Sequence, residues 1–313
     1  MGHSGSILVS DPVIYEAVKD MDDIKTKKHH KKVKDLISHA FHYSQDQRQY
    51  AKSVELYNEA LDIQINLLQL DVDGNNISVA STRNDMGIVH CKMGHYDESI
   101  VCLWDALATK KTHYGDDHLK VAATLYNLAV CHTCRHEYEM AREIFEEALL
   151  ITTKKLGNFH LDVSSILHKK GIVHFKLQEE ILAGACFRQA FAIRKRHLGN
   201  MHLLIAETTR WLGNLEMQKD RRKEAIQYYK NALRIAKQAE GLQQRKRAEI
   251  AMVLSCVCQF YFSYDDRRDD VEQAGRDALY IFSTMSILPK EDIELMESKD
   301  RVEKIFDQLQ IKI

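Results

Sequence analysis

A short segment containing a glycine and a histidine recurs along this chain at a constant interval of 42 residues. Its glycines are Gly115, Gly157 and Gly199, and a histidine follows each of them by three positions. A register held over several copies is typical of tandem repeats, in which each unit buries its apolar face against its neighbours. The same interval separates small residues at Gly87, Ala129, Gly171 and Gly213, and large ones at Leu103, Phe145, Phe187 and Tyr229.

Each repeat unit is predicted to contain two amphipathic helices. Small residues at one helical position let the two helices approach closely, and a bulky residue one turn away fills the remaining space. The chain of 313 residues contains only two Pro and 13 Gly, which favours long helices over a sheet with many turns. In the third copy, apolar residues recur at helical spacing in two stretches, first at Leu125, Leu128, Ala129 and His132 and then at Ala141, Ile144, Phe145, Ala148 and Leu149.

The repeats divide the chain into three predicted regions. Residues 1–30 are expected to form a flexible N-terminal tail with a basic cluster, and residues 31–288 a solenoid of about six helix pairs. Pro289 interrupts the chain and opens a last helix, so residues 289–313 are expected to cap the array. The predicted fold class is all-α, a solenoid of helix-turn-helix repeats.

The repeats resemble tetratricopeptide repeats. The residues that carry the resemblance are Thr124–Ala129 in the first helix, and Tyr138, Ala141, Phe145 and Ala148 in the second. The 42-residue step, with its Leu-Gly-x-x-His connector, resembles the long repeats of kinesin light chain, and the resemblance covers roughly residues 35–288. It implies a right-handed superhelix whose first helices line a concave groove, and in this family the groove binds extended or helical segments of partner proteins.

Two features depart from kinesin light chains. These relatives usually carry Pro after the connector histidine, whereas this chain has Leu119, Leu161 and Leu203 there. No long heptad pattern precedes the repeats to form the coiled coil that joins a motor. The resemblance therefore extends to the repeat module and not to the motor role.

One stripe of each first helix is expected to face away from its partner helix and into the groove. The stripe combines cations that select carboxylates, Asn side chains that can hold a peptide backbone, and aromatic residues that offer pockets for anchors. We therefore expect an acidic partner segment with an aromatic or Leu anchor; alternatively, these side chains are solvated or pack between repeats. The candidate groove residues are Asn84, Lys92, Tyr126, Asn127, His168, Lys169, Phe175, Lys176, Arg210, Trp211 and Asn214.

Cysteine and histidine patterns raise the question of a metal site. Cys131 and Cys134 form the only C-x-x-C motif, but no second pair of ligands follows at zinc-site spacing, so we interpret them as small packing residues. His90, His132 and His174 lie 42 residues apart. They form either a pH- or metal-sensitive ladder or, as we expect, a core position with one hydrogen bond each. The connector histidines are expected to brace the turns between units.

The sequence contains no nucleophile elbow, phosphate-binding loop or zinc-protease motif. We therefore predict that the protein is not an enzyme and has no catalytic residues, no cofactor and no metal. The 44 Lys and Arg nearly balance the 45 Asp and Glu, which argues against nucleic acid as a partner. Seven Cys, an odd number without a signal-peptide pattern, favour reduced thiols and a cytoplasmic location.

The N-terminus fits a lipidation pattern. Met1–Ser6 matches the motif for N-myristoylation at Gly2, and six lysines follow between Lys25 and Lys34. An acyl chain combined with a polybasic patch can hold a protein at an anionic membrane, which would give peripheral membrane contact. Alternatively, the first residues are an expression remnant, and the lysines are a nuclear import signal or the solvated start of the first helix.

These patterns together predict a non-enzymatic adaptor or scaffold for protein–protein interaction. It would bind a partner peptide segment in the concave groove. The alternatives are a structural subunit of a larger assembly that uses its outer faces, and a myristoylated membrane-associated regulator.

Overall fold

The computed structural model describes residues 12–44, 49–70, 76–239, 243–263, 267–285 and 293–311, and within these ranges the regular elements are helices. They form six successive pairs followed by a single helix, so the predicted all-α solenoid is confirmed. The pairs are α1 (Pro12–Tyr43) with α2 (Tyr50–Asp62), α3 (Ile77–Lys92) with α4 (Tyr96–Tyr114), α5 (Leu119–Cys134) with α6 (Tyr138–Leu156), α7 (Leu161–Lys176) with α8 (Glu180–Leu198), α9 (Leu203–Gln218) with α10 (Arg222–Gln238), and α11 (Gln243–Phe262) with α12 (Arg268–Thr284). The turn η2 (Ile63–Leu67) extends α2, and α13 (Ile293–Gln308) ends the array.

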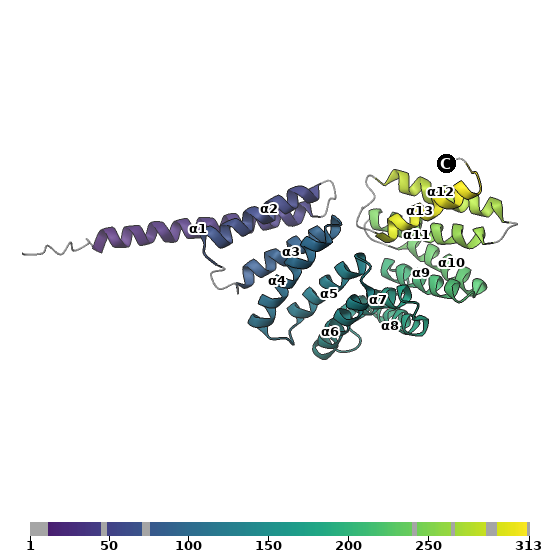
Figure 1. The fold of residues 1–313 in the computed structure, drawn as a ribbon, viewed down its shortest axis with the longest axis horizontal. Coiled ribbons are helices and arrows are strands. Elements are labelled where there is room, and N and C mark those ends of the chain that lie inside the picture. Colours follow the sequence, from purple (N-terminus) through teal and green to yellow (C-terminus); the bar gives the residue numbers. More distant parts are fainter. Residues whose placement is uncertain are drawn as a thin grey trace, which may run out of the picture.

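The pairs stack side by side into a curved array. Figure 1 shows the first helices, from α3 to α11, on the inside of the curve and the second helices on the outside. Successive first helices also contact each other, α3 with α5, α5 with α7, α7 with α9 and α9 with α11. The array therefore has a concave face made by first helices and a convex face made by second helices.

A glycine and a capping histidine fix the connectors before α5, α7 and α9. Gly157 adopts φ 82° and ψ 162°, a conformation that is essentially restricted to glycine. Three residues later, Nδ1 of His160 accepts a hydrogen bond from the backbone N–H of Asp162 (3.2 Å) and caps the N-terminus of α7. The prediction that the connector histidines brace the turns is therefore confirmed. Equivalent side-chain caps precede α3, α5 and α9, at Asn76, His118 and His202.

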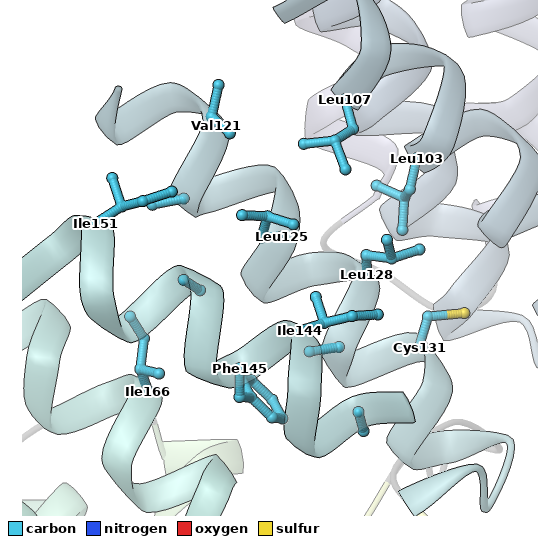
Figure 2. Close-up of a cluster of buried hydrophobic side chains, with 14 of the residues drawn as sticks. Leu103, Leu107, Val121, Leu125, Leu128, Cys131, Ile144, Phe145, Ile151 and Ile166 are labelled. Atoms are coloured by element: carbon cyan, nitrogen blue, oxygen red, sulfur yellow. The ribbon is translucent and has the colours of Figure 1, made fainter. Parts of the chain in front are cut away.

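The two helices of a pair approach each other at the small residues that recur every 42 positions. A Cβ atom added to Gly171 would lie 2.7 Å from Cε1 of Phe187, so a larger residue does not fit without movement. Between the pairs, buried apolar side chains of α4, α5, α6 and α7 form one continuous cluster (Figure 2). Phe145 and Leu128, at its centre, are fully buried. The core thus runs from repeat to repeat instead of closing within each pair.

The N-terminal helix is longer than predicted. α1 begins at Pro12, so residues 12–30, expected in a flexible tail, belong to a helix. No Pro or Gly follows Pro12 before Tyr43, and the helix is therefore not interrupted. It extends past α2 in Figure 1, and its basic cluster touches that helix through Lys32, which pairs with Glu59 at 2.7 Å. The lipidation candidate Gly2 lies outside the described residues.

α13 covers the apolar side of the last pair. The last helix expected after Pro289 is present and runs from Ile293 to Gln308. It packs on both α11 and α12, to which it contributes the buried side chains Leu295, Val302, Ile305 and Phe306.

Candidate functional site

The candidate groove residues lie on the concave helices α3, α5, α7 and α9, but most of them contact a neighbouring repeat. Asn84, His168, Arg210 and Trp211 are buried, and the others are half-buried. The expectation that these four side chains face outward is therefore wrong. The physical reason is the curvature of the array, which brings successive first helices into contact and encloses the side chains between them.

Asn84 links α3 to α5. Its Oδ1 accepts hydrogen bonds from Oγ1 of Thr124 (3.2 Å) and from Nδ2 of Asn127 (3.4 Å), both on α5. Its Nδ2 donates to Oδ1 of Asp85 at 3.0 Å. The amide group of Asn84 is thus used inside the protein and cannot hold a peptide backbone in this arrangement.

His168 links α7 to α9 through Glu207. Its Nε2 lies 3.2 Å from Oε1 of Glu207, and Nη1 of Arg194 lies 3.4 Å from Oε2 of the same carboxylate. Burial lowers the pKa of His168, although Glu207 acts in the opposite direction. Burial alone would raise the pKa of Glu207, but His168 and the nearby cations hold it well below its usual value. At neutral pH a neutral imidazole therefore lies beside an ionised carboxylate.

Arg210 repeats this link one unit later, between α9 and α11. Its Nε donates to Oε1 of Glu249 at 2.9 Å and its Nη2 donates to Oε2 at 3.4 Å. The next residue, Trp211, stacks on Phe187 with ring centroids 5.8 Å apart and meets Phe175 edge-on at 5.2 Å. Arg210 and Trp211, both predicted to line the groove, are therefore part of the packing between repeats.

The acidic partners Glu207 and Glu249 are absent from the sequence candidates, although the repeat contains the signal for them. His168 and Arg210 are 42 residues apart, and so are Glu207 and Glu249. The same two repeat positions thus hold a pair of ionisable side chains that links first helices in two successive units. A comparison of the charged residues at equivalent positions of successive repeats would have identified these links, whereas a comparison along one face of a single helix does not.

Lys92 and Asn214 also contact neighbouring elements. Nζ of Lys92 donates to the backbone carbonyl of Ser44, at the end of the first helix of the chain, at 3.1 Å. Oδ1 of Asn214 accepts hydrogen bonds from the hydroxyl of Tyr229 (2.9 Å) and from the thiol of Cys256 (3.3 Å). Each of these contacts holds a first helix against an adjacent element.

The remaining candidates lie on α5 and α7, and we refer to Tyr126, Asn127, Lys169, Phe175 and Lys176 as the α5–α7 patch. All five side chains are half-buried. Lys169 and Lys176 are two turns apart and so project from the same side of α7. Burial raises the pKa of Tyr126, which keeps its hydroxyl neutral. The patch therefore combines cationic, aromatic and amide groups at the middle of the concave face.

Lys176 is in contact with the C-terminal helix. Its Nζ lies 3.2 Å from Oε2 and 3.4 Å from Oε1 of Glu297 in α13. Among the described residues, Glu297 is the acidic side chain that pairs with Lys176. The ammonium group of Lys176 is therefore already paired with a carboxylate of the same chain.

Of the three histidines that recur at one position of the first helices, two form a hydrogen bond with a glutamate five residues later. Nδ1 of His132 lies 2.6 Å from Oε2 of Glu137, and His174 makes the same contact with Glu179. His90 lacks this partner because His95 stands at the equivalent position. The histidines are therefore separate packing residues in successive repeats.

Cys131 is a packing residue of the core. It is fully buried, and its thiol donates to the backbone carbonyl of Tyr96 at 3.7 Å. Across the described ranges, no group of His, Cys, Asp and Glu is arranged to hold a metal ion. None of the helices there combines the length and the hydropathy that crossing a membrane would take.

Comparison with known proteins supports the repeat assignment. A family model described as tetratricopeptide repeat matches residues 78–154, 120–196 and 162–238, which together cover just over half of the chain. No curated protein sequence matches the chain.

Solved structures share the fold at low sequence identity. Nearly identical TPR-like repeats of a putative kinesin light chain from Podosopora anserina are 19% identical, with a TM-score of 0.55, and the match covers 65% of this chain and 94% of that one. BtubC (BKLC) from P. vanneervenii is 16% identical, with a TM-score of 0.61 and coverage of 77% and 94%. A Rap protein complexed with competence and sporulation factor is 14% identical, with a TM-score of 0.60 and coverage of 93% and 75%. At these identities the likeness shows the fold alone.

Proposed function

Because the chain belongs to the tetratricopeptide repeat family, we propose that it is a non-enzymatic adaptor that binds a segment of a partner protein on its concave face. Tetratricopeptide repeat proteins generally mediate protein–protein interactions. The fold alone is compatible with many functions, so the choice of partner must come from the side chains of a specific surface. We assign that surface to the α5–α7 patch and place the adaptor in the cytoplasm.

The observation that carries the proposal is the pair of lysines on α7, the central first helix of the concave face. Lys169 and Lys176 point to the same side and are only partly exposed. Cations in such positions bind carboxylates more strongly than fully solvated ones do. The aromatic rings of Tyr126 and Phe175 offer surface for an apolar anchor. The partner segment is therefore acidic and contains an aromatic or Leu residue.

A display screen of disordered peptides against the full chain tests this proposal. The screen is run in parallel on the Lys169→Glu variant and on a matched control, Lys195→Glu, which makes the same charge change on the exposed face of α8. Circular dichroism checks that both variants keep their helices. We expect acidic peptides with an aromatic or Leu anchor to be enriched by the parent and by Lys195→Glu, and to be lost with Lys169→Glu. Equal enrichment by all three proteins, or none by any, would contradict the proposal.

A second candidate function follows from the convex face. Ile181 of α8, Leu150 of α6 and Val101 of α4 are 83%, 70% and 61% exposed. Large apolar side chains exposed on neighbouring second helices suit a folded partner, as in a structural subunit of an assembly. If this second function is right, replacing Ile181 and Leu150 with Ser abolishes assembly and leaves peptide enrichment unchanged. If the protein acts only through its concave face, the same variant keeps both its assembly state and its peptide enrichment.

A further inference from the structure

The C-terminal helix departs from the packing of the solenoid. From α5 to α11, each first helix packs on the second helix of the preceding pair more extensively than on the first helix of that pair. α13 instead packs more extensively on α11 than on α12, and it lies beside α11 in Figure 1. Because α11 is a concave helix, α13 extends over the concave side of the last repeat and does not simply continue the array.

The two halves of α13 contribute unequally to the buried cluster that the helix shares with α11 and α12. In the C-terminal half, Val302, Ile305 and Phe306 are buried in the cluster shared with α11 and α12. In the N-terminal half, Leu295 is buried and the backbone carbonyl of Ser298 accepts a hydrogen bond from Oγ of a serine in α11 at 2.7 Å. Of the α13 side chains that the structure describes, the C-terminal half thus contributes three to this cluster and the N-terminal half one, Leu295.

The side chain of Glu297 connects the N-terminal half of α13 to α7, although α9 lies between α7 and α11 in the array. Both of its carboxylate oxygens approach Nζ of Lys176, at 3.2 Å and 3.4 Å. The side chains of Lys176 and Glu297 are 30% and 39% exposed, so the pair is in contact with water. A partly exposed ion pair contributes little to stability and can exchange its acidic member for another. Lys176 belongs to the α5–α7 patch, so α13 already occupies part of the proposed partner surface.

The chemistry of α13 matches that of the expected partner. The helix contains five acidic and three basic residues, and Leu295 and Phe306 are its buried apolar anchors. We propose that the N-terminal half of α13 is an internal competitor, and that the partner is an acidic amphipathic helix that replaces Glu297 on Lys176. This inference rests on the proposed function and narrows it, because it selects a helical partner over an extended one and makes binding dependent on release of α13.

Hydrogen exchange of the full chain tests the internal contact without any partner. Glu297→Lys places two cations face to face, whereas Asp300→Lys makes the same charge change at an exposed position of α13. We expect the amides of residues 297–302 to exchange at least about fivefold faster in Glu297→Lys than in the parent, and to stay unchanged in Asp300→Lys. The charge swap Lys176→Glu with Glu297→Lys should restore slow exchange. Equal rates in the two single variants would show that the ion pair does not hold α13 and would overturn the inference.

Peptide binding then tests competition. The probe is a fluorescent synthetic peptide with the sequence of residues 290–310, which is an acidic helix of the proposed class. We expect Glu297→Lys to bind it about tenfold more tightly than the parent and Asp300→Lys do, because the internal competitor is released. Equal affinity for all three proteins would overturn the competition. If exchange responds as expected but the peptide binds none of them, the acidic partner of the proposed function is wrong and α13 is only a cap.

Discussion

Arg210 and Glu249 form a bidentate ion pair that joins α9 to α11 and is almost completely shielded from water. Nε and Nη2 of the guanidinium reach the two carboxylate oxygens at 2.9 Å and 3.4 Å, and the side chains are 3% and 4% exposed. His168 and Glu207 occupy the equivalent positions one repeat earlier. Pairs of ionisable side chains therefore link α7 to α9 and α9 to α11, and the pair of Arg210 and Glu249 is closed to a ligand.

Removal of one member of this pair should be strongly destabilising. We expect Arg210→Ala to lower the free energy of unfolding by about 3–5 kcal/mol, because it removes the guanidinium that balances the buried charge of Glu249. The double variant Arg210→Met with Glu249→Leu should be much less affected, since apolar residues of similar volume avoid burying any charge. Urea denaturation followed by far-UV circular dichroism measures both.

The exposed pair of Arg276 and Glu272 on α12 is the matched control for Arg210. These side chains are 49% and 37% exposed, and their nitrogen–oxygen distance is 2.7 Å. Arg276→Ala should cost less than about 0.5 kcal/mol. If Arg210→Ala costs no more than this control, the buried pair is not the structural link that its burial indicates.

Two glycines should respond differently to the same substitution. Gly157→Ala strains the backbone by about 1–3 kcal/mol, because alanine is placed in a conformation that favours glycine, although the space around it is open. Gly171→Ala should cost about 1–3 kcal/mol for another reason, since the new methyl group meets the ring of Phe187. Thermal unfolding of both variants gives the two values.

A second substitution separates the two causes. Phe187→Leu opens space beside Gly171, so it should recover part of the stability lost in Gly171→Ala. It should recover none of the loss in Gly157→Ala, which is a backbone effect. An equal recovery in both backgrounds would rule out the clash as the reason for glycine at position 171.

The repeat interval predicts the fold because the features that recur with it depend on residues close in the sequence. The turn conformation of Gly157 and the cap of His160 depend on neighbours a few residues away, so the spacing alone identifies them. The burial of Arg210 depends on Glu249, 39 positions later, and on the curvature of the array. Helix periodicity gives the side of α9 on which Arg210 lies, but not whether the next repeat covers that side. The contact between Lys176 and Glu297 spans 121 positions and lies outside any repeat interval.

The stability of the chain should fall between about pH 7 and pH 5 because of His168. Its folded pKa lies below the usual 6.5, so the unfolded chain takes up the proton first as the pH falls, and unfolding becomes more favourable. The folded pKa of Glu207 lies well below its usual 4.5, so the stability that it contributes is present above that pH and is lost in more acidic solution. Thermal midpoints measured from pH 8 to pH 5 isolate the contribution of His168.

His168→Gln should flatten this part of the pH profile, because its amide does not titrate. The exposed His113 on α4 offers a control, and His113→Gln should leave the slope between pH 7 and pH 5 as it is in the parent. A parent profile that is flat over this range, or that His168→Gln leaves unchanged, would contradict the assignment of acid sensitivity to His168.

The cap at the start of α7 should be replaceable by the asparagine that caps α3. Asn76 accepts hydrogen bonds from two backbone N–H groups of α3, those of Ser78 (2.9 Å) and Val79 (3.4 Å), whereas His160 accepts one from α7. We expect His160→Ala to cost about 0.5–2 kcal/mol, because the backbone N–H of Asp162 in the first turn of α7 loses its side-chain acceptor. His160→Asn should be neutral or stabilising. Urea denaturation gives both values. If the Asn variant is as unstable as the Ala variant, His160 stabilises the connector through its ring contacts and not as a helix cap.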